Sequence, residues 1–247
     1  MNNGPAWVVT DLAALHAGVV HVPLPGFFTQ AQVDGVLKAT QADALMTHAS
    51  AELLTDTWGF RETHSIDEGL QLQLHLRATR PVDLHPGTSK ITFTSGSTGQ
   101  PKGVCLGASK MLDVAAGLAD ATRHVNVERH LTALPLPVLL ENIAGVYAPL
   151  IEGAACIVLP ADQVGLNGSS HFDAVRMHGA LVAHKAHSVI LLPQMLRAYA
   201  ATLHKNGWRA PDTLRLVAVG GGAVGQSLLD QAHARGLPAF EGYGLSE

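Results

Sequence analysis

Apolar residues along the chain alternate between helical and strand spacing from one end to the other. The helical spacing predicts helices over residues 7–16, 30–39, 110–122, 139–148, 172–183 and 224–234, and another beginning at Pro193. Short apolar runs predict strands over residues 19–22, 44–47, 91–93, 104–106, 131–134, 155–159, 189–192, 214–219 and 238–240. The segments 85–89 and 161–170 contain Gly, Pro and polar residues and are expected to be loops.

Most of the expected strands are short and apolar, which is typical of strands buried on both faces of a parallel sheet. Their alternation with helices predicts an α/β fold of layered, mostly parallel sheets with flanking helices. The length of 247 residues allows one large core or two small ones.

The composition, 47% apolar and 15% charged, is that of a globular protein rather than a disordered one. Sixteen basic and twenty acidic residues give a net charge of -4, so no nucleic-acid partner is expected. The sequence shows neither a signal peptide nor an apolar run long enough for a transmembrane segment. Only Cys105 and Cys156 are present, without metal-ligand spacing, which favours a reducing, cytoplasmic location.

Fourteen histidines raise the question of a metal site, but they are scattered along the chain. The closest plausible pair, His184 and His187, has no acidic or cysteine partner nearby in the sequence. We therefore expect these histidines to be solvated or part of the core.

The segment 94–103, TSGSTGQPKG, crowds small, hydroxylated and flexible residues just before a single lysine. Glycines let the backbone approach an anion, and backbone amides and hydroxyls donate hydrogen bonds to phosphate oxygens. Lys102 adds a mobile positive charge, and the apolar run 91–93 places the loop after a strand. The sequence thus predicts a polyphosphate-binding loop that comprises Thr94, Ser95, Gly96, Ser97, Thr98, Gly99 and Lys102.

Two other interpretations of this segment are less favoured. A surface turn needs only two or three such residues, whereas hydroxyls and glycines fill residues 94–99 without a break. A P-loop NTPase places Gly-Lys-Ser/Thr at the start of a helix, but here Lys102 lies between Pro101 and Gly103 and strand-like residues follow.

A second glycine run, Gly220, Gly221 and Gly222, follows an apolar strand, and together with Gly225 it fits the GxGxxG pattern. Glu241 lies about twenty residues further on, where the ribose-binding acid of a dinucleotide fold sits. Such a fold needs more βα units after that acid, and only residues 242–247 remain. An NAD-type dinucleotide-binding enzyme is therefore kept as the least favoured alternative.

Three elements in order, TSGSTGQPKG, the glycine run at 220–222 and YGLSE at 243–247, resemble the adenylate-forming (AMP-binding) superfamily, most closely its acyl-CoA synthetases. The segment 11–25, DLAALHAGVVHVPLP, is similar to an early helix-strand segment of that family. The likeness spans nearly the whole chain.

The resemblance implies a role for each matching residue. Residues 95–99 would wrap the β and γ phosphates of ATP, and Lys102 would neutralise their charge. Tyr243, followed by Gly244, would stack on adenine, Ser246 would contact the α-phosphate, and Glu247 would ligate Mg²⁺. The three glycines 220–222 would run beside adenine and the acyl carboxylate. Lys102, Ser246 and Glu247 are accordingly the expected catalytic residues.

The implied activity is an acid–thiol ligase that uses ATP and Mg²⁺ to activate a small-molecule carboxylate, with CoA as the acceptor. If the helix 139–148 lines the acyl pocket, its apolar residues favour a fatty acid, although plain core is the more expected role. Pro137 and Val138 stand where such enzymes usually carry an aromatic or histidine gate. Asp113 and Asp120 are candidates for holding an amino group, but neither matches a family pattern.

Family members continue with a ribose-binding aspartate, a hinge and a mobile C-terminal domain, and they begin earlier than this sequence. Residues 1–247 are therefore expected to be part of an AMP-binding domain, a fragment with little activity alone, whose C-terminal domain lies elsewhere on a full-length or separate chain. The alternatives are a non-catalytic nucleotide-binding module and one piece of a split enzyme.

Overall fold

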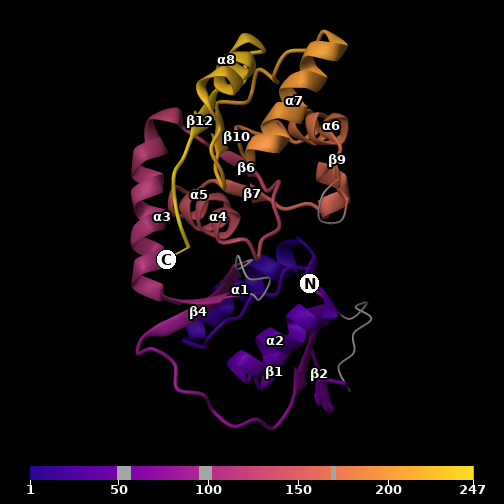
Figure 1. Ribbon diagram of the computed structural model, residues 1–247, viewed down its shortest axis with the longest axis vertical. Coiled ribbons are helices and arrows are strands. Elements are labelled where there is room, and N and C mark those ends of the chain that lie inside the picture. Colours follow the sequence, from indigo (N-terminus) through magenta and orange to yellow (C-terminus); the bar gives the residue numbers. More distant parts are fainter. Residues whose placement is uncertain (49–56, 95–101, 168–170, 247) are drawn as a thin grey trace. The chain divides into compact units, whose positions relative to one another are not determined.

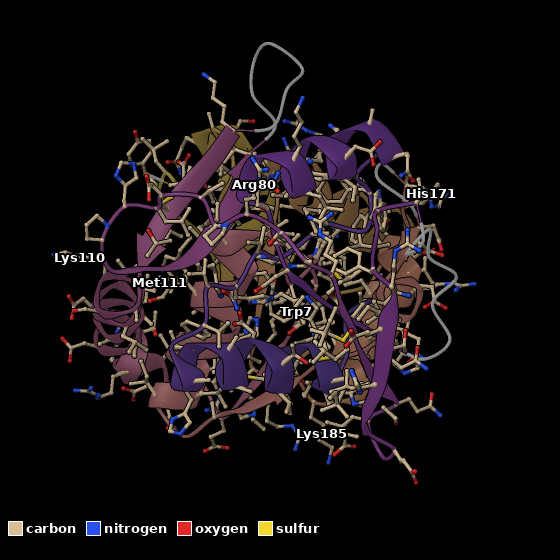
Figure 2. All side chains as sticks on the ribbon, turned by 90° about the horizontal axis from the view of Figure 1, so that it is seen from below. Trp7, Arg80, Lys110, Met111, His171 and Lys185 are labelled. Atoms are coloured by element: carbon tan, nitrogen blue, oxygen red, sulfur yellow. The ribbon has the colours of Figure 1, made fainter. Side chains whose placement is uncertain are left out.

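The computed structural model describes residues 1–48, 57–94, 102–167 and 171–246. The chain forms two compact units: the first is Met1–Lys110 together with Ser246, and the second is Met111–Leu245. Lys110 and Met111, between which the division falls, are labelled in Figure 2.

Two helices and two antiparallel sheets make up the described part of the first unit. Its elements are α1 (Pro5–Ala17), α2 (Gln30–Thr40), β1 (Ala44–His48), β2 (Glu62–Asp67), β3 (Leu72–Leu76), β4 (Thr88–Thr94) and β5 (Lys102–Gly107). One sheet has the order β1-β3-β2, and the other is the pair β4-β5. A capping box in which Thr29 and Gln32 exchange hydrogen bonds begins α2.

A buried ionic cluster joins α1 to β4. The Lys90 ammonium lies 2.7 Å from the Asp11 carboxylate, and the His21 ring lies 2.6 Å from the same oxygen. Burial alone would raise the pKa of Asp11, but the hydrogen bond from His21 and the charge of Lys90 outweigh it and lower that pKa. The cluster therefore fixes the strand that precedes the expected phosphate loop.

The second unit is built on a five-stranded sheet that is parallel throughout, in the order β12-β11-β10-β6-β7. The described helices of this unit are α3 (Ala108–Thr122, entering from the first unit), η1 (Arg123–Val125), α4 (Leu139–Asn142), η2 (Ile143–Tyr147), α5 (Ala148–Ile151), η3 (Ala161–Val164), α6 (Ala174–Ala183), α7 (Pro193–Asn206) and α8 (Gln226–Ala234). The strands are β6 (Arg129–Leu131), β7 (Ala155–Ile157), β8 (Leu166–Asn167), β9 (His171–Phe172), β10 (Ser188–Leu191), β11 (Leu216–Val219) and β12 (Ala239–Glu241).

The core of this unit lies between the sheet and its helices. Figure 1 shows the sheet with α3 on one side and α6 and α7 on the other. All four residues of β10 are buried, and Met177, Leu196 and Tyr199 pack into the same cluster. None of the described helices is long and apolar enough to cross a bilayer.

The predicted α/β class is confirmed, and several predictions of detail need correction. The three antiparallel sheets were not expected, and β2 and β3 were not predicted at all. The segment 161–170 is not simply a loop, because it contains η3 and β8, and Thr88 in the segment 85–89 begins β4. Helix α6 begins at Ala174, since Phe172 belongs to β9, and the stretch 19–22 contributes a single bridge at His21.

Candidate active site

The carboxyl edge of the parallel sheet has the geometry of a ligand site. Strand β6 is followed in the chain by β7 on one side of it, whereas β10 on its other side is followed by β11 and then β12. The strand order therefore reverses between β6 and β10, and in open α/β sheets ligands bind at the carboxyl ends of the strands beside such a reversal. The segments that leave this edge start at Thr132, Leu192, Gly220 and Gly242.

The glycine run after β11 permits close packing at this edge. A Cβ on Gly220 would lie 3.2 Å from Leu140 Cδ2, and a Cβ on Gly221 would lie 2.8 Å from Leu192 Cδ2. Gly221 also has φ +78°, a conformation that L side chains rarely adopt. Gly221 and Gly222 are exposed, so their backbone is available to a ligand.

Residues at the end of β12 close the same edge. The Gly242 amide donates to the Val219 carbonyl at 2.8 Å, and the Glu241 carboxylate accepts a hydrogen bond from the Val224 amide at 3.0 Å. Glu241 thus holds the loop that follows the glycine run. Tyr243, the expected adenine partner, follows directly and is 92% exposed. The structure therefore brings Tyr243 and Gly244 to the edge that carries Gly220, and their contacts with adenine stay predictions.

The expected phosphate loop lies between paired strands of the first unit. Thr94 ends β4 and is paired with Lys102 at the start of β5. Ser95, Gly96, Ser97, Thr98 and Gly99 lie outside the described residues, as does Glu247, the expected magnesium ligand. Ser246 is described but belongs to the first unit. That the phosphate loop and the terminal motif share one cleft stays a prediction.

The strand pairing also shows why Gly103 follows the lysine. A Cβ at this position would lie 3.0 Å from the ring of Phe93 and 3.1 Å from Ile91 Cγ2. A strand follows Lys102 where a Walker A motif would have a helix, in agreement with the sequence argument against a P-loop NTPase.

Sequence reasoning missed a buried polar network beside the reversal of strand order. Glu141 on α4 is fully buried and its Oε1 lies 3.0 Å from His130 Nε2, while His130 Nδ1 lies 2.8 Å from the Ser188 hydroxyl. Oε2 of Glu141 accepts a hydrogen bond from the Leu134 amide at 3.0 Å. Burial raises the pKa of Glu141, against the opposing effect of the bonds from His130 and backbone amides. The network fixes the segment that leaves β6.

A π-turn separates α4 from α5, where the sequence predicted one continuous helix over 139–148. Gly145 lies in this turn, and a Cβ there would be 2.2 Å from Glu141 Oε1. The only sequence signals of the network are a glutamate in an apolar helical stretch and a histidine in a short strand. Near it, the fully buried hydroxyl of Thr132 has no hydrogen-bond partner within the described residues.

Other residues singled out in the sequence have ordinary structural partners. His187 Nδ1 accepts a hydrogen bond from the Glu128 amide, and the His184 carbonyl accepts one from Arg129. Asp120 pairs with Arg123 on the protein surface. Within the described ranges, no group of three or more His, Cys, Asp or Glu side chains is placed to hold a metal ion.

Comparison with known proteins identifies the family. The model of the family described as AMP-binding enzyme matches residues 1–247. The chain belongs to this family. It is 25% identical to the 2-succinylbenzoate–CoA ligase of Bacillus pumilus and 29% identical to the feruloyl-CoA synthase of an Amycolatopsis species, in alignments that cover 100% and 99% of the chain. In both cases the alignment covers 48% of the relative, so this AMP-binding chain spans about half the length of the curated relatives it matches.

Solved structures of AMP-binding enzymes share the fold. A malonyl-CoA ligase with methylmalonyl-CoA and AMP bound superposes with a TM-score of 0.76 at 23% identity, covering 99% of this chain and 50% of the ligase. The o-succinylbenzoate coenzyme A synthetase of Bacillus subtilis, in complex with ATP and magnesium, gives a TM-score of 0.72 at 21% identity, covering 100% of this chain and 48% of that one. The resemblance to the adenylate-forming superfamily is thereby confirmed, and the dinucleotide alternative gains no support.

Proposed function

We propose that this chain carries the nucleotide- and acid-binding part of an AMP-forming acid–thiol ligase. A carboxylate oxygen attacks the α-phosphorus of ATP and pyrophosphate leaves, which gives an acyl adenylate. The sulfur of a thiol, with CoA as the acceptor, then attacks the acyl carbon and AMP leaves. Because the substrate carboxylate is itself the nucleophile, the protein mainly positions the groups and neutralises their charge.

The match of the AMP-binding family model to the whole of residues 1–247 carries this proposal. The names of the two relatives given above, a CoA ligase and a CoA synthase, support CoA as the acceptor. The complex of the Bacillus subtilis synthetase contains ATP and magnesium, which supports the same nucleotide and ion here.

The proposed roles follow the sequence motifs. Residues 94–99 and Lys102 hold the β and γ phosphates, Gly220, Gly221 and Gly222 run beside adenine and the acid, and Tyr243 and Gly244 hold the base. Ser246 contacts the α-phosphate, and Glu247 ligates the Mg²⁺ that would bridge the phosphates. The exposed backbone at Gly221 and Gly222 supports the second of these assignments.

The substrate class is proposed as a carboxylic acid. The relatives named above act on 2-succinylbenzoate and ferulate, which are aromatic acids, so they give no support to the fatty acid expected from the sequence. Fatty acids are kept as one part of the acid panel in the experiments below.

Calorimetric titration of the 247-residue chain with Mg·ATP tests the nucleotide site. Lys102→Ala should weaken binding at least tenfold, because it removes the mobile positive charge beside the phosphates. Lys205→Ala, at an exposed lysine in the last turn of α7, is the matched control and should leave binding unchanged. Equal affinities of the two variants, or the absence of ATP binding, would contradict the proposal.

A second candidate is a nucleotide-binding piece that needs a further domain for turnover, and the coverage of only half of the relatives favours it. Pyrophosphate release, measured with a panel of carboxylic acids, separates the two. The chain alone is expected to bind Mg·ATP but to release little pyrophosphate. Rapid acid-dependent release would show that a mobile C-terminal domain is dispensable.

A further inference from the structure

The second unit contains a cavity of about 200 Å³ between the sheet and the helices α3, η2 and α5. Its walls include the small side chains Ala144, Ala148 and Ala218, together with Ile190. Exposed side chains of Arg123 and Glu128 lie at its outer end. All of its lining residues belong to the second unit.

The cavity lies on the same face of the sheet as the glycine run. Successive side chains of a strand alternate between faces, so Leu216, Ala218 and the position of Gly220 share one face. Ile190 is paired with Ala218 and Ser188 with Leu216, which places them in the same rows of this face. Four residues separate Gly220 from Leu216, a length of about 13 Å along the strand. The cavity thus extends from just below the carboxyl edge toward the opposite edge of the sheet.

A helix covers this face along the same line. Leu140 lies against Gly220 at the carboxyl edge, while Ala144, one turn later, lines the cavity. Leu140 is therefore the side chain that stands between the glycine run and the cavity.

The inner part of the cavity offers one neutral polar group. Ser188 and His130 both line it, and the Ser188 hydroxyl is hydrogen-bonded to the His130 ring. A serine hydroxyl supplies one hydrogen and two lone pairs, so one bond to His130 leaves capacity for another. The second ring nitrogen of His130 is engaged by Glu141. Ser188 is thus the group that can bind a polar atom of a ligand.

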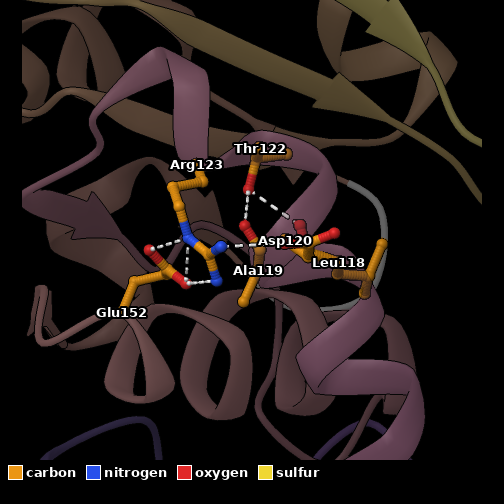
Figure 3. A network of polar contacts seen from close by, with 6 residues as sticks. All are labelled: Leu118, Ala119, Asp120, Thr122, Arg123 and Glu152. Atoms are coloured by element: carbon orange, nitrogen blue, oxygen red, sulfur yellow. Dashed lines mark hydrogen bonds and ion pairs between the residues drawn. The ribbon is translucent and has the colours of Figure 1, made fainter.

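The outer end of the cavity does not favour a second negative charge. The Arg123 guanidinium is already engaged by Glu152 at 3.1 Å and Asp120 at 2.9 Å, as Figure 3 shows. Glu128 and Glu152 also line the cavity, so its lining carries two carboxylates and one guanidinium. A ligand with a carboxylate at this end would meet repulsion, whereas a neutral group would not.

We infer that this cavity holds the organic part of the carboxylic acid, and that Ser188 hydrogen-bonds a neutral polar group, such as a hydroxyl, near its far end. The inference rests on the proposed function, because it places the carboxylate at the edge beside Gly220. The substrate class is then a carboxylic acid with an apolar body, short enough to fit within about 13 Å, and a distal hydroxyl or oxo group.

Titration of the 247-residue chain with two matched series of acids tests the inference. Straight-chain alkanoic acids and their ω-hydroxy analogues, stepped in length, are titrated calorimetrically with and without a non-hydrolysable ATP analogue. At the length that reaches Ser188, the hydroxy acid should bind about three- to tenfold tighter than the plain acid, as expected for one neutral hydrogen bond. Affinity should fall for longer acids.

Three variants assign the effect to the cavity. Ser188→Ala should remove the preference for the hydroxyl and leave the affinity for plain acids unchanged. Ala218→Leu should weaken binding of the longer acids at least tenfold and spare the shortest ones, because the added carbons fill the middle of the cavity. Ala121→Leu makes the same change at an exposed residue outside the lining and should have no effect.

The outcomes separate this inference from the proposed function. A hydroxyl preference that survives Ser188→Ala, or a length limit that survives Ala218→Leu, overturns the inference even if Mg·ATP binds through Lys102. Failure of Mg·ATP binding counts against the proposed function whatever the acid titrations give. Absence of binding by acids of every length, with and without the nucleotide analogue, also overturns the inference.

Discussion

Gly145 is the position where one added carbon should do most damage to the candidate site. In Gly145→Ala, the new methyl group would lie 2.2 Å from Glu141 Oε1 and 2.7 Å from His130 Nε2. Contacts this short force the buried carboxylate to move, since both neighbours are enclosed by packed side chains. The hydrogen bonds that Glu141 makes with His130 and with the Leu134 amide, both 3.0 Å long, are then strained or lost.

The magnitude follows from these contacts. Each hydrogen bond to a buried charged group contributes about 1.5–3 kcal/mol, and alanine regains up to about 1 kcal/mol over glycine in a helix. The net loss of unfolding free energy should therefore be about 2–4 kcal/mol. For a chain of this size that corresponds to a decrease in melting temperature of roughly 5–15 °C.

Thermal and urea unfolding followed by circular dichroism measure this loss. Gly179→Ala is the matched control, because Gly179 lies in α6 and a Cβ there meets nothing within 4 Å. It should be neutral or stabilising by up to about 1 kcal/mol. In the double variant Gly145→Ala/Glu141→Ala the overlap disappears, so the two losses should be clearly less than additive. A Gly145→Ala protein as stable as Gly179→Ala would refute the reasoning.

Three further predictions concern the same unit. Gly221→Ala should lose about 1–2 kcal/mol of stability because of its positive φ and the contact with Leu192, whereas Gly222→Ala, whose Cβ would meet only Pro193 at 3.7 Å, should not; equal unfolding curves would contradict this. Thr132→Val should raise the unfolding free energy by about 1 kcal/mol, since it removes a buried hydroxyl that has no partner in the described part of the chain, and a loss would indicate an unseen hydrogen bond. Burial, assisted by the charge of Glu141, raises the pKa of Cys156 to about 11, so in a Cys105→Ser background its alkylation at pH 8 should be at least a hundredfold slower in the folded than in the urea-unfolded chain, and comparable rates would disprove it.

The sequence predicted those parts of the fold whose signal is local. Strands β6, β10 and β11 are short apolar runs because they are buried in a parallel sheet, and the prediction found them within a few residues. Strand β2 was missed because its six residues, ETHSID, are all exposed and carry no apolar alternation. Its conformation depends on pairing with β3, which no pattern within the segment reveals.

The candidate site divides in the same way. The phosphate loop and the terminal YGLSE motif could be predicted because their chemistry is written in consecutive residues. The network of Glu141, His130 and Ser188 could not, since its hydrogen bonds join residues 11 and 58 positions apart. The π-turn that aims Glu141 inward also interrupts the regular spacing from which the helix was predicted.

Glu141 connects the two functional regions proposed for this unit. Through Oε2 it holds the Leu134 amide, in the segment that leaves β6 at the carboxyl edge, and through His130 it orients the Ser188 hydroxyl in the cavity. If Glu141 is ionised, His130 donates to it and accepts from Ser188, whose free lone pairs then accept from a ligand hydroxyl. If Glu141 is protonated, the bonds reverse and Ser188 becomes a donor suited to an oxo group. The protonation state of one buried acid would thereby select between two kinds of distal group on the substrate.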